Sequence, residues 1–231
     1  MKIAISQPTF LPWQGYFALI NYVDEFIFLD DVQFEKRSWQ QRNKIKYMGN
    51  ELLLTVPVIT RNKYNQKINE VLIDQNSNYI DKHLKTIKLA YSKTKYFELY
   101  FPKISDIYNK NFKKLIDLNK NLIDFFLTEL NIIKKISFSS DLRLSENKHF
   151  LIDKICKLKK CTTYISTKGS QEYLNLINKK DITYKIKYFD FKNELYQQTT
   201  GSFIKFLSVA DLLFNKGTDS KLYLEKNFFI E

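Results

Sequence analysis

A chain of 231 residues with 44% hydrophobic and 16% aromatic side chains can bury a large core, which excludes an intrinsically disordered protein. The formal net charge of +12 favours polyanionic partners, namely nucleic acid, a nucleotide-activated substrate, an acidic carrier protein or an anionic membrane face, although the many Asn and Ile residues also fit a compositional bias. Only two cysteines and no apolar run of membrane-spanning length occur, so we expect a cytoplasmic protein without a disulfide scaffold.

The first 30 residues predict a strand–helix–strand unit. Residues 2–6 alternate with β-branched side chains and predict a short strand. Pro12 suits the first turn of a helix, which Phe17 and Ile20 continue at helical spacing. Residues 26–29 are continuously apolar, as in a parallel strand that is buried on both faces.

The rest of the chain predicts one α/β domain with a helical insertion. Residues 52–58 and 68–73 predict a pair of strands that the polar loop 60–66 connects, and a helical region follows at about 79–131. Strands are then predicted at 136–138, 163–166 and 183–188, and helices at 148–158, 171–177 and around 209–214. The expected fold is a three-layer, mainly parallel, Rossmann-like α/β domain over residues 1–231.

The stretch QPTFLPWQG follows the first predicted strand, where open α/β sheets bind their ligands. Gly15 permits a close backbone approach, and Gln7 offers a donor and an acceptor. The rings of Trp13 and Tyr16 are candidates for stacking on a base or a sugar. The alternative is a shaped turn whose aromatic side chains fill the core, because no phosphate-binding glycine motif is present.

Asp30 and Asp31 come directly after the second predicted strand, at the same edge of the sheet. A carboxylate there is suited to act as a general base, to bind a metal or to hold a ribose hydroxyl. Neighbouring residues on an extended chain point to opposite faces, so only one of the two is expected to face a given cleft. A turn cap is the alternative.

A basic, amide-rich stretch follows the two acids, with Gln33, Lys36, Arg42 and Asn43 as candidates for binding phosphate groups. Phe34 and Trp39 lie between them, a pattern that also suits single-stranded nucleic acid. For Lys44 and Lys46 we expect side chains in solvent.

Only two histidines occur, His83 and His149, which excludes a zinc site with several histidines. His83 is our preferred acid/base residue, with a partly buried structural role as the alternative. Cys156 and Cys161 are expected to be structural. No metal site is predicted.

The stretch TKGSQEYL places Gly169 between a predicted strand and a helix. Lys168 and Ser170 would then face an anion in the same cleft. An ordinary connection with Ser170 as helix cap is the alternative.

These segments resemble the WbqC-like family of bacterial O-antigen and surface-polysaccharide gene clusters. The resemblance rests on QPTFLPWQGYF, FLDDVQFEKRSWQQRNKIK, LLLTVPV, the region from His83 to residue 97, YISTKGSQEYL and LSVADLLFNKG, which span nearly the whole chain. Positions that match the family pattern include Gln7, Trp13, Gly15, Tyr16, Asp30, Asp31, Gln33, Lys36, Arg42, Asn43, His83, Tyr91, Gly169 and Tyr173.

The resemblance implies an N-acyltransferase, with a glycyl or other aminoacyl group as a candidate, that acts on a nucleotide-linked amino sugar. The family offers no catalytic assignment to carry over; from the residues themselves, we expect His83, Asp30 or Asp31 to be the base and the other matching positions to bind substrate. An acyl thioester on CoA or on an acidic carrier protein is a candidate co-substrate. One alternative is a nucleotidyltransferase-like enzyme, because ISFSS and YISTKGS resemble a motif of such enzymes, but no HxGH pair is present. A non-catalytic nucleic-acid-binding protein is a further alternative, and the resemblance makes nucleic acid the less expected partner.

Overall fold

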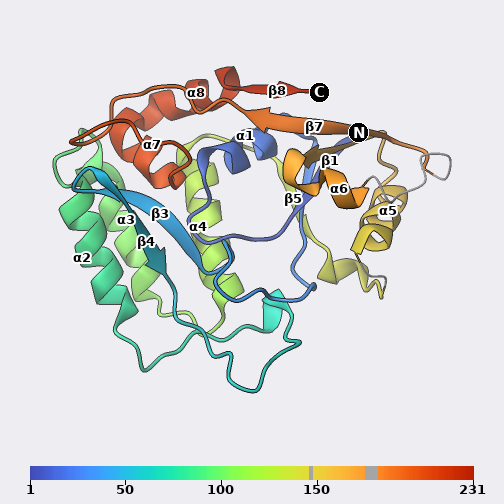
Figure 1. Ribbon diagram of the computed structural model, residues 1–231, viewed down its shortest axis with the longest axis horizontal. Helices are drawn as coiled ribbons and strands as arrows, with labels where there is room; N and C mark the ends of the chain where they lie inside the picture. The colour runs from blue at the N-terminus through green and yellow to red at the C-terminus, as the bar shows by residue number, and fades with distance from the viewer. Residues whose placement is uncertain (146–147, 175–181) are drawn as a thin grey trace.

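A computed structural model of the protein describes residues 1–145, 148–174 and 182–231, and its centre is a six-stranded sheet (Figure 1). The strands lie in the order β5-β2-β1-β6-β7-β8; the first five run parallel and β8 is antiparallel to β7. Their bounds are β1 Lys2–Ser6, β2 Glu25–Phe28, β5 Lys135–Phe138, β6 Thr163–Thr167, β7 Lys185–Phe191 and β8 Phe228–Ile230. Counting only the parallel strands gives the order 3-2-1-4-5 of Rossmann folds, which confirms the predicted fold class.

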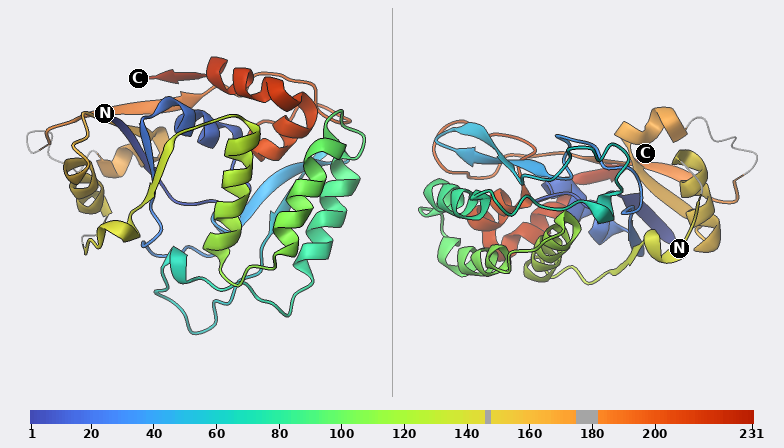
Figure 2. Two further views of the ribbon diagram at one scale, coloured as in Figure 1. Left: turned by 180° about the vertical axis from the view of Figure 1, so that it is seen from behind. Right: turned by 90° about the horizontal axis from the view of Figure 1, so that it is seen from below.

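Both faces of this sheet are buried, because successive side chains of a strand point to opposite sides. Ile3 and Ile27 join one core cluster, with α5 (Lys148–Leu158) and Leu174 of α6 (Gln171–Leu174). Ala4 and Phe26 join the other cluster, with α1 (Gln14–Tyr22), α7 (Val209–Lys216) and α8 (Ser220–Lys226). Helices on the two faces give the three expected layers (Figure 2).

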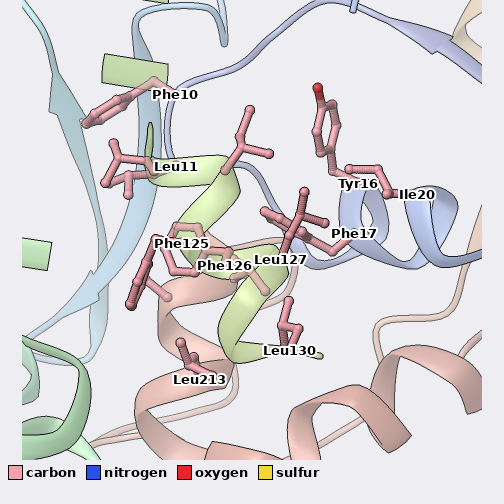
Figure 3. Close-up of a cluster of buried hydrophobic side chains, with 14 of the residues drawn as sticks. Phe10, Leu11, Tyr16, Phe17, Ile20, Phe125, Phe126, Leu127, Leu130 and Leu213 are labelled. Atoms are coloured by element: carbon pink, nitrogen blue, oxygen red, sulfur yellow. The ribbon is translucent and has the colours of Figure 1, made fainter. Parts of the chain in front are cut away.

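Three helices fill the stretch for which helices were predicted, and they lie together beside the sheet (Figure 1). They are α2 (Tyr79–Tyr91), α3 (Phe97–Asn109) and α4 (Leu115–Glu129). Helix α4 packs directly against α1: the ring centroids of Phe126 and Phe17 are 5.6 Å apart (Figure 3). The helical segment and one face of the sheet therefore share a single core.

The predicted pair of strands at 52–58 and 68–73 is confirmed only at one end, where Val58 and Ile73 form an isolated antiparallel bridge. The hairpin instead joins β3 (Arg42–Tyr47) to β4 (Asn50–Thr55), and Ile68–Glu70 forms a short 3-10 helix, η1. The two-residue turn between β3 and β4 has Met48 at φ 50° and Gly49 at φ 81°, the left-handed conformations of a type I′ hairpin turn. Methionine is unusual in that conformation, so the turn was not predictable from its residues.

The remaining elements follow the predicted alternation. Helix α7 begins after Ser208, whose hydroxyl accepts a hydrogen bond from the Ala210 amide at 3.2 Å. The 3-10 turns are η2 (Ser140–Leu142), η3 (Lys168–Ser170) and η4 (Gly217–Asp219). The helix predicted at 171–177 is present to Leu174, and its later residues lie outside the described part of the chain. Among the described residues, no helix has the length and apolar character needed to cross a membrane.

Gly15 is required by the packing of Trp13. A Cβ atom at Gly15 would lie 2.1 Å from the Trp13 ring, whereas one at Gly169 would meet no atom within 4 Å. We therefore expect Gly15→Ala to lower the free energy of unfolding by about 1–3 kcal/mol, as overpacking does. Gly169→Ala, the matched control, should change it by at most about 1 kcal/mol. Urea denaturation of the two variants measures the difference, and equal stabilities would contradict this account.

Candidate functional site

The candidate site is the carboxyl edge of the sheet, by which we mean the residues that directly follow β1, β2, β5 and β6. These residues include Gln7, Asp30, Asp31, Ser139, Ser140 and Lys168–Ser170. Between β1 and β6 the strand order changes direction, and open α/β sheets bind ligands at such a switch point. The fold thus brings together at one edge four chain segments that are far apart in the sequence.

Asp30 accepts from three donor groups of Ser140 and Asn69 and is 4% exposed. Its Oδ1 accepts from the Ser140 amide at 3.0 Å, and its Oδ2 accepts from Ser140 Oγ at 2.8 Å and Asn69 Nδ2 at 3.4 Å. Ser139 Oγ lies 3.2 Å from Oδ1. This carboxylate is fully engaged in joining β2 to β5 and η1, so a structural role suits it better than that of a base.

Asp31 has a different environment from its neighbour. Its carboxylate is half-buried and accepts a short hydrogen bond from Ser139 Oγ. Ser139 is itself fully buried and lies between the two acids. Both carboxylates contact the Ser139 hydroxyl, and Asp31 is the more accessible of the two.

Gln7 ends β1 and meets the second motif through a side-chain contact. Its Oε1 accepts from Gln40 Nε2 at 2.8 Å, and Gln40 Oε1 accepts from the Glu35 amide at 3.1 Å. The Gln40 carbonyl in turn accepts from Asn119 Nδ2 of α4 at 2.8 Å. Gln7 stays half-buried at the edge, so it remains a candidate for ligand binding.

Asn43, Trp13 and Tyr16 shape the loop after β1 instead of facing an open cleft. Asn43 is 4% exposed, and its Nδ2 donates to the carbonyls of Phe10 and Leu11 at 3.1 and 2.9 Å. Trp13 lies edge-on to Phe191 with ring centroids 5.6 Å apart.

Tyr16 is 5% exposed, and its hydroxyl donates to the Gln7 carbonyl at 3.0 Å. Burial raises the pKa of this phenol well above its ordinary value. The core-filling alternative describes these aromatic side chains, and Gly15 serves the Trp13 ring.

Tyr91 and Lys46 belong to a buried polar network around Asp211. The Tyr91 hydroxyl donates to Asp211 at 2.9 Å and accepts from the Lys46 amide at 3.1 Å. Lys46 Nζ donates to Gln198 Oε1 at 3.2 Å and to the Ser202 carbonyl at 2.7 Å. The prediction that Lys46 lies in solvent is therefore wrong, because the segment around Ser202 covers it. Burial lowers the pKa of Lys46, and the charge of Asp211 opposes that shift.

The remaining members of the basic run are spread over the surface. Lys44 pairs with Glu51 across the hairpin at 2.6 Å, and Arg42 is half-buried on the same strand. Gln33 and Lys36 are exposed and lie near Tyr64: Gln33 Nε2 donates to the Tyr64 carbonyl at 3.1 Å, and Lys36 Nζ is 5.5 Å from its ring centroid.

Lys168 and Gly169 lie at the end of β6. Lys168 Nζ pairs with Asp190 at 2.9 Å and Glu231 at 3.0 Å, so its charge is directed to the neighbouring strands β7 and β8. Gly169 is exposed with open space beside its Cα. The side chain of Tyr173 lies outside the described part of the structure.

His83 is 6% exposed in α2, and both of its ring nitrogens have partners. Nε2 lies 3.1 Å from the Thr55 carbonyl, and Nδ1 lies 3.3 Å from the Tyr108 hydroxyl. Since a carbonyl only accepts, Nε2 carries the proton and Nδ1 accepts from Tyr108. Burial lowers the pKa of His83 to about 4, partly opposed by the Thr55 carbonyl. Because the imidazole is enclosed and neutral, we correct the preference for His83 as acid/base residue: the structural role, which was the alternative, describes it better.

Three residues at the candidate site were not predicted from the sequence, namely Ser139, Ser140 and Asn69. The two serines directly follow β5, so the rule that singled out Asp30 and Asp31 applies to them equally. Asn69 carried no such signal, because its segment was assigned to a strand.

The comparison with known proteins gives a family but no solved relative. The WbqC-like protein family matches residues 7–223 of this chain. An uncharacterised protein of Mycobacterium tuberculosis, Rv1507c, is 32% identical over 225 residues, which cover 96% of this chain and 97% of that protein. No solved structure matches.

The burial of His83 predicts a loss of stability in acid. Its folded pKa of about 4 lies below the ordinary 6.5, so its contribution is complete above pH 6.5 and disappears as the pH falls to about 4. We expect about 3 kcal/mol of the unfolding free energy to be lost in this window. In His83→Gln, which cannot titrate, the stability difference from the wild type should shrink by that amount between pH 7 and pH 4. Urea denaturation at a series of pH values measures it, and parallel curves would contradict it.

Proposed function

This chain belongs to the WbqC-like protein family, and we propose that it is a transferase that joins an acyl or aminoacyl group to the amine of a nucleotide-linked sugar. The observation that carries the proposal is the Rossmann strand order, with accessible polar groups at the switch between β1 and β6. Assembly of O-antigen or another surface polysaccharide is the process that the family resemblance implies.

The nucleotide is assigned to the switch point. Gly169 follows β6 with open space at its Cα, so a phosphate can approach the backbone there. Gln7 lies across the switch point at the end of β1 and has an amide side chain for a base or ribose. Trp13 and Tyr16, which the core holds, are left out of this assignment.

Asp31 is assigned as the base. The amine of the sugar attacks the carbonyl carbon of an acyl thioester, and the resulting intermediate loses the thiolate as the C–S bond breaks and the C–N bond remains. Asp31 takes the proton that the nitrogen loses. CoA or an acidic carrier protein is the class of thioester donor, and the positive net charge of +12 favours either one.

Ser139 is assigned a positioning role. Its hydroxyl lies between Asp30 and Asp31, and Asp30 is fixed by Ser140 and Asn69. This chain of contacts orients the Asp31 carboxylate, so one acid supports the other. Neither a charged histidine nor a metal is needed for the step.

A nucleic-acid-binding protein is the less favoured alternative. It would need the basic run to form a continuous surface, but Lys46 is buried, Asn43 is bound to backbone carbonyls, and Lys44 is paired with Glu51. Lys36 and Arg37 remain as exposed members of that run. The other alternative was a nucleotidyltransferase-like enzyme, and the absence of the HxGH pair from the sequence counts against that hypothesis.

Substituting the two acids separately tests the proposal. Asp31→Asn keeps the shape and should lower turnover by about 10²–10⁴-fold, as loss of a general base does, while stability changes by less than about 0.5 kcal/mol. Asp30→Asn, the matched variant, should lower the free energy of unfolding by about 1–3 kcal/mol, because its donors lose a charged acceptor. Mass spectrometry of nucleotide amino sugars incubated with acyl-CoA or glycyl-CoA detects the amide product.

A thermal-shift screen of nucleotide sugars, acyl-CoAs and oligonucleotides precedes that assay. We expect specific, saturable protection by a nucleotide sugar. Protection by every oligonucleotide, with a steep dependence on salt, would favour the nucleic-acid hypothesis instead.

For the assay of the two acids, turnover of Asp31→Asn at the wild-type rate would contradict the assignment of Asp31 as the base.

A further inference from the structure

A polar hollow of about 530 Å³ lies outside the switch point, at the loop between β4 and η1. Its lining consists of Asn62, Lys63, Tyr64, Asn65, Gln66 and Glu70. The volume falls in the range of small-molecule sites, roughly 300–1,000 Å³. This loop carried no predicted function, and it forms the lower border of the molecule in Figure 1.

Backbone hydrogen bonds attach the loop to the segment that follows β2. The Phe34 amide donates to the Gln66 carbonyl at 2.9 Å, and the Ile68 amide donates to the Val32 carbonyl at 3.0 Å. The Asn69 amide donates to the Asp30 carbonyl at 3.0 Å. These bonds fix the backbone of the loop to the segment that carries Asp30 and Asp31.

The lining combines an exposed aromatic ring with several amides. Tyr64 is 76% exposed, which is unusual for so large a side chain and leaves a ring face for a ligand. Gln66 is 8% exposed; its Nε2 donates to the Ile59 carbonyl at 3.3 Å, and its Oε1 has no partner among the described residues. An unbonded buried acceptor is costly and indicates a donor that completes the site.

The charges of the hollow favour a neutral ligand over a phosphate. Lys63 and Glu70 are the charged residues of its lining and are opposite in sign. Lys36 Nζ lies 5.5 Å from the Tyr64 ring centroid, so its charge is engaged in a cation–π contact with that ring. Amides and a carboxylate exchange hydrogen bonds with hydroxyl groups, and an aromatic face packs on the C–H groups of a pyranose.

We propose that this hollow binds the sugar ring of the acceptor, with Tyr64 as its stacking surface and Gln66 as the acceptor for a hydroxyl or amide N–H. The inference rests on the proposed function, since the loop that lines the hollow is hydrogen-bonded to the segment that carries Asp31. The nucleotide portion then occupies the switch point and contributes separately to binding.

Calorimetry and saturation-transfer NMR on the full chain test this assignment. The probes are glucose, galactose, glucosamine and N-acetylglucosamine, each free and as its UDP derivative, and UDP alone. Tyr64→Ala should weaken binding of the recognised sugar and its UDP derivative at least tenfold and leave UDP binding unchanged. Tyr64→Trp should restore it. Met48→Ala removes a side chain that is equally exposed at 76%, in the hairpin turn, and serves as the matched control.

The outcomes separate the inference from the proposed function. Equal affinity of wild type and Tyr64→Ala for a UDP-sugar would overturn the inference and leave the proposed function standing. Binding of free sugars that depends on Tyr64, without any binding of UDP or UDP-sugars, would uphold the hollow and overturn the nucleotide-linked substrate. Loss of oligonucleotide binding in Tyr64→Ala, with no sugar bound by the wild type, would overturn both.

Discussion

The rest of the site depends on the hydrogen bonds that the side-chain amide of Asn43 donates. It donates to the carbonyls of Phe10 and Leu11, and Leu11 adopts φ 43°, a left-handed conformation that costs a bulky residue about 1–3 kcal/mol. The two carbonyls are buried and would lack donors without Asn43, so its hydrogen bonds compensate for the strain of the turn. Since Asn43 lies on β3, the same contact fixes the hairpin to the loop after β1 and brings Gln40 to Gln7. The loop after β1 and the segment that contains β3, which carry the two long motifs of the sequence, are thus hydrogen-bonded to each other.

The repeating order of strand and helix was predictable from the sequence, because strands buried on both faces have continuous apolar runs and helices have apolar stripes. The position of Asp30 and Asp31 followed from that order alone. Strand β3 was not predictable in the same way: its Arg and Lys residues resemble a solvated segment, and only tertiary cover buries Lys46. The role of Ser139 depends on the pairing of β5 with β2, a long-range contact with no local pattern.

Buried polar residues in this chain differ in how completely they are bonded. Asp211 accepts from Tyr91 at 2.9 Å and from Tyr196 at 2.6 Å, and burial raises its pKa although both phenols oppose the shift. That network joins α2 and α7 to the segment around Ser202, and both ring nitrogens of His83 have partners. Gln14, Asn119 and Gln66 each have a side-chain amide oxygen without a donor among the described residues, and of these three Gln66 lines the hollow. Incomplete bonding supports a ligand only where it coincides with a hollow.

The two ends of the sheet also differ in how completely their charged groups are bonded. At the amino end, buried Glu25 accepts from Lys159 at 2.6 Å and Ser137 at 2.7 Å, so its charge is paired within the protein, and the terminal amine of Met1 donates to the Thr162 hydroxyl at 2.7 Å. At the carboxyl end, Asp30 is bonded in this way but Asp31 retains access to solvent. Both faces of the sheet are covered by core clusters, so the ends of the strands are where polar groups can meet a ligand. One acid of the pair fixes the edge, and in the proposed function that rigidity holds its neighbour in position.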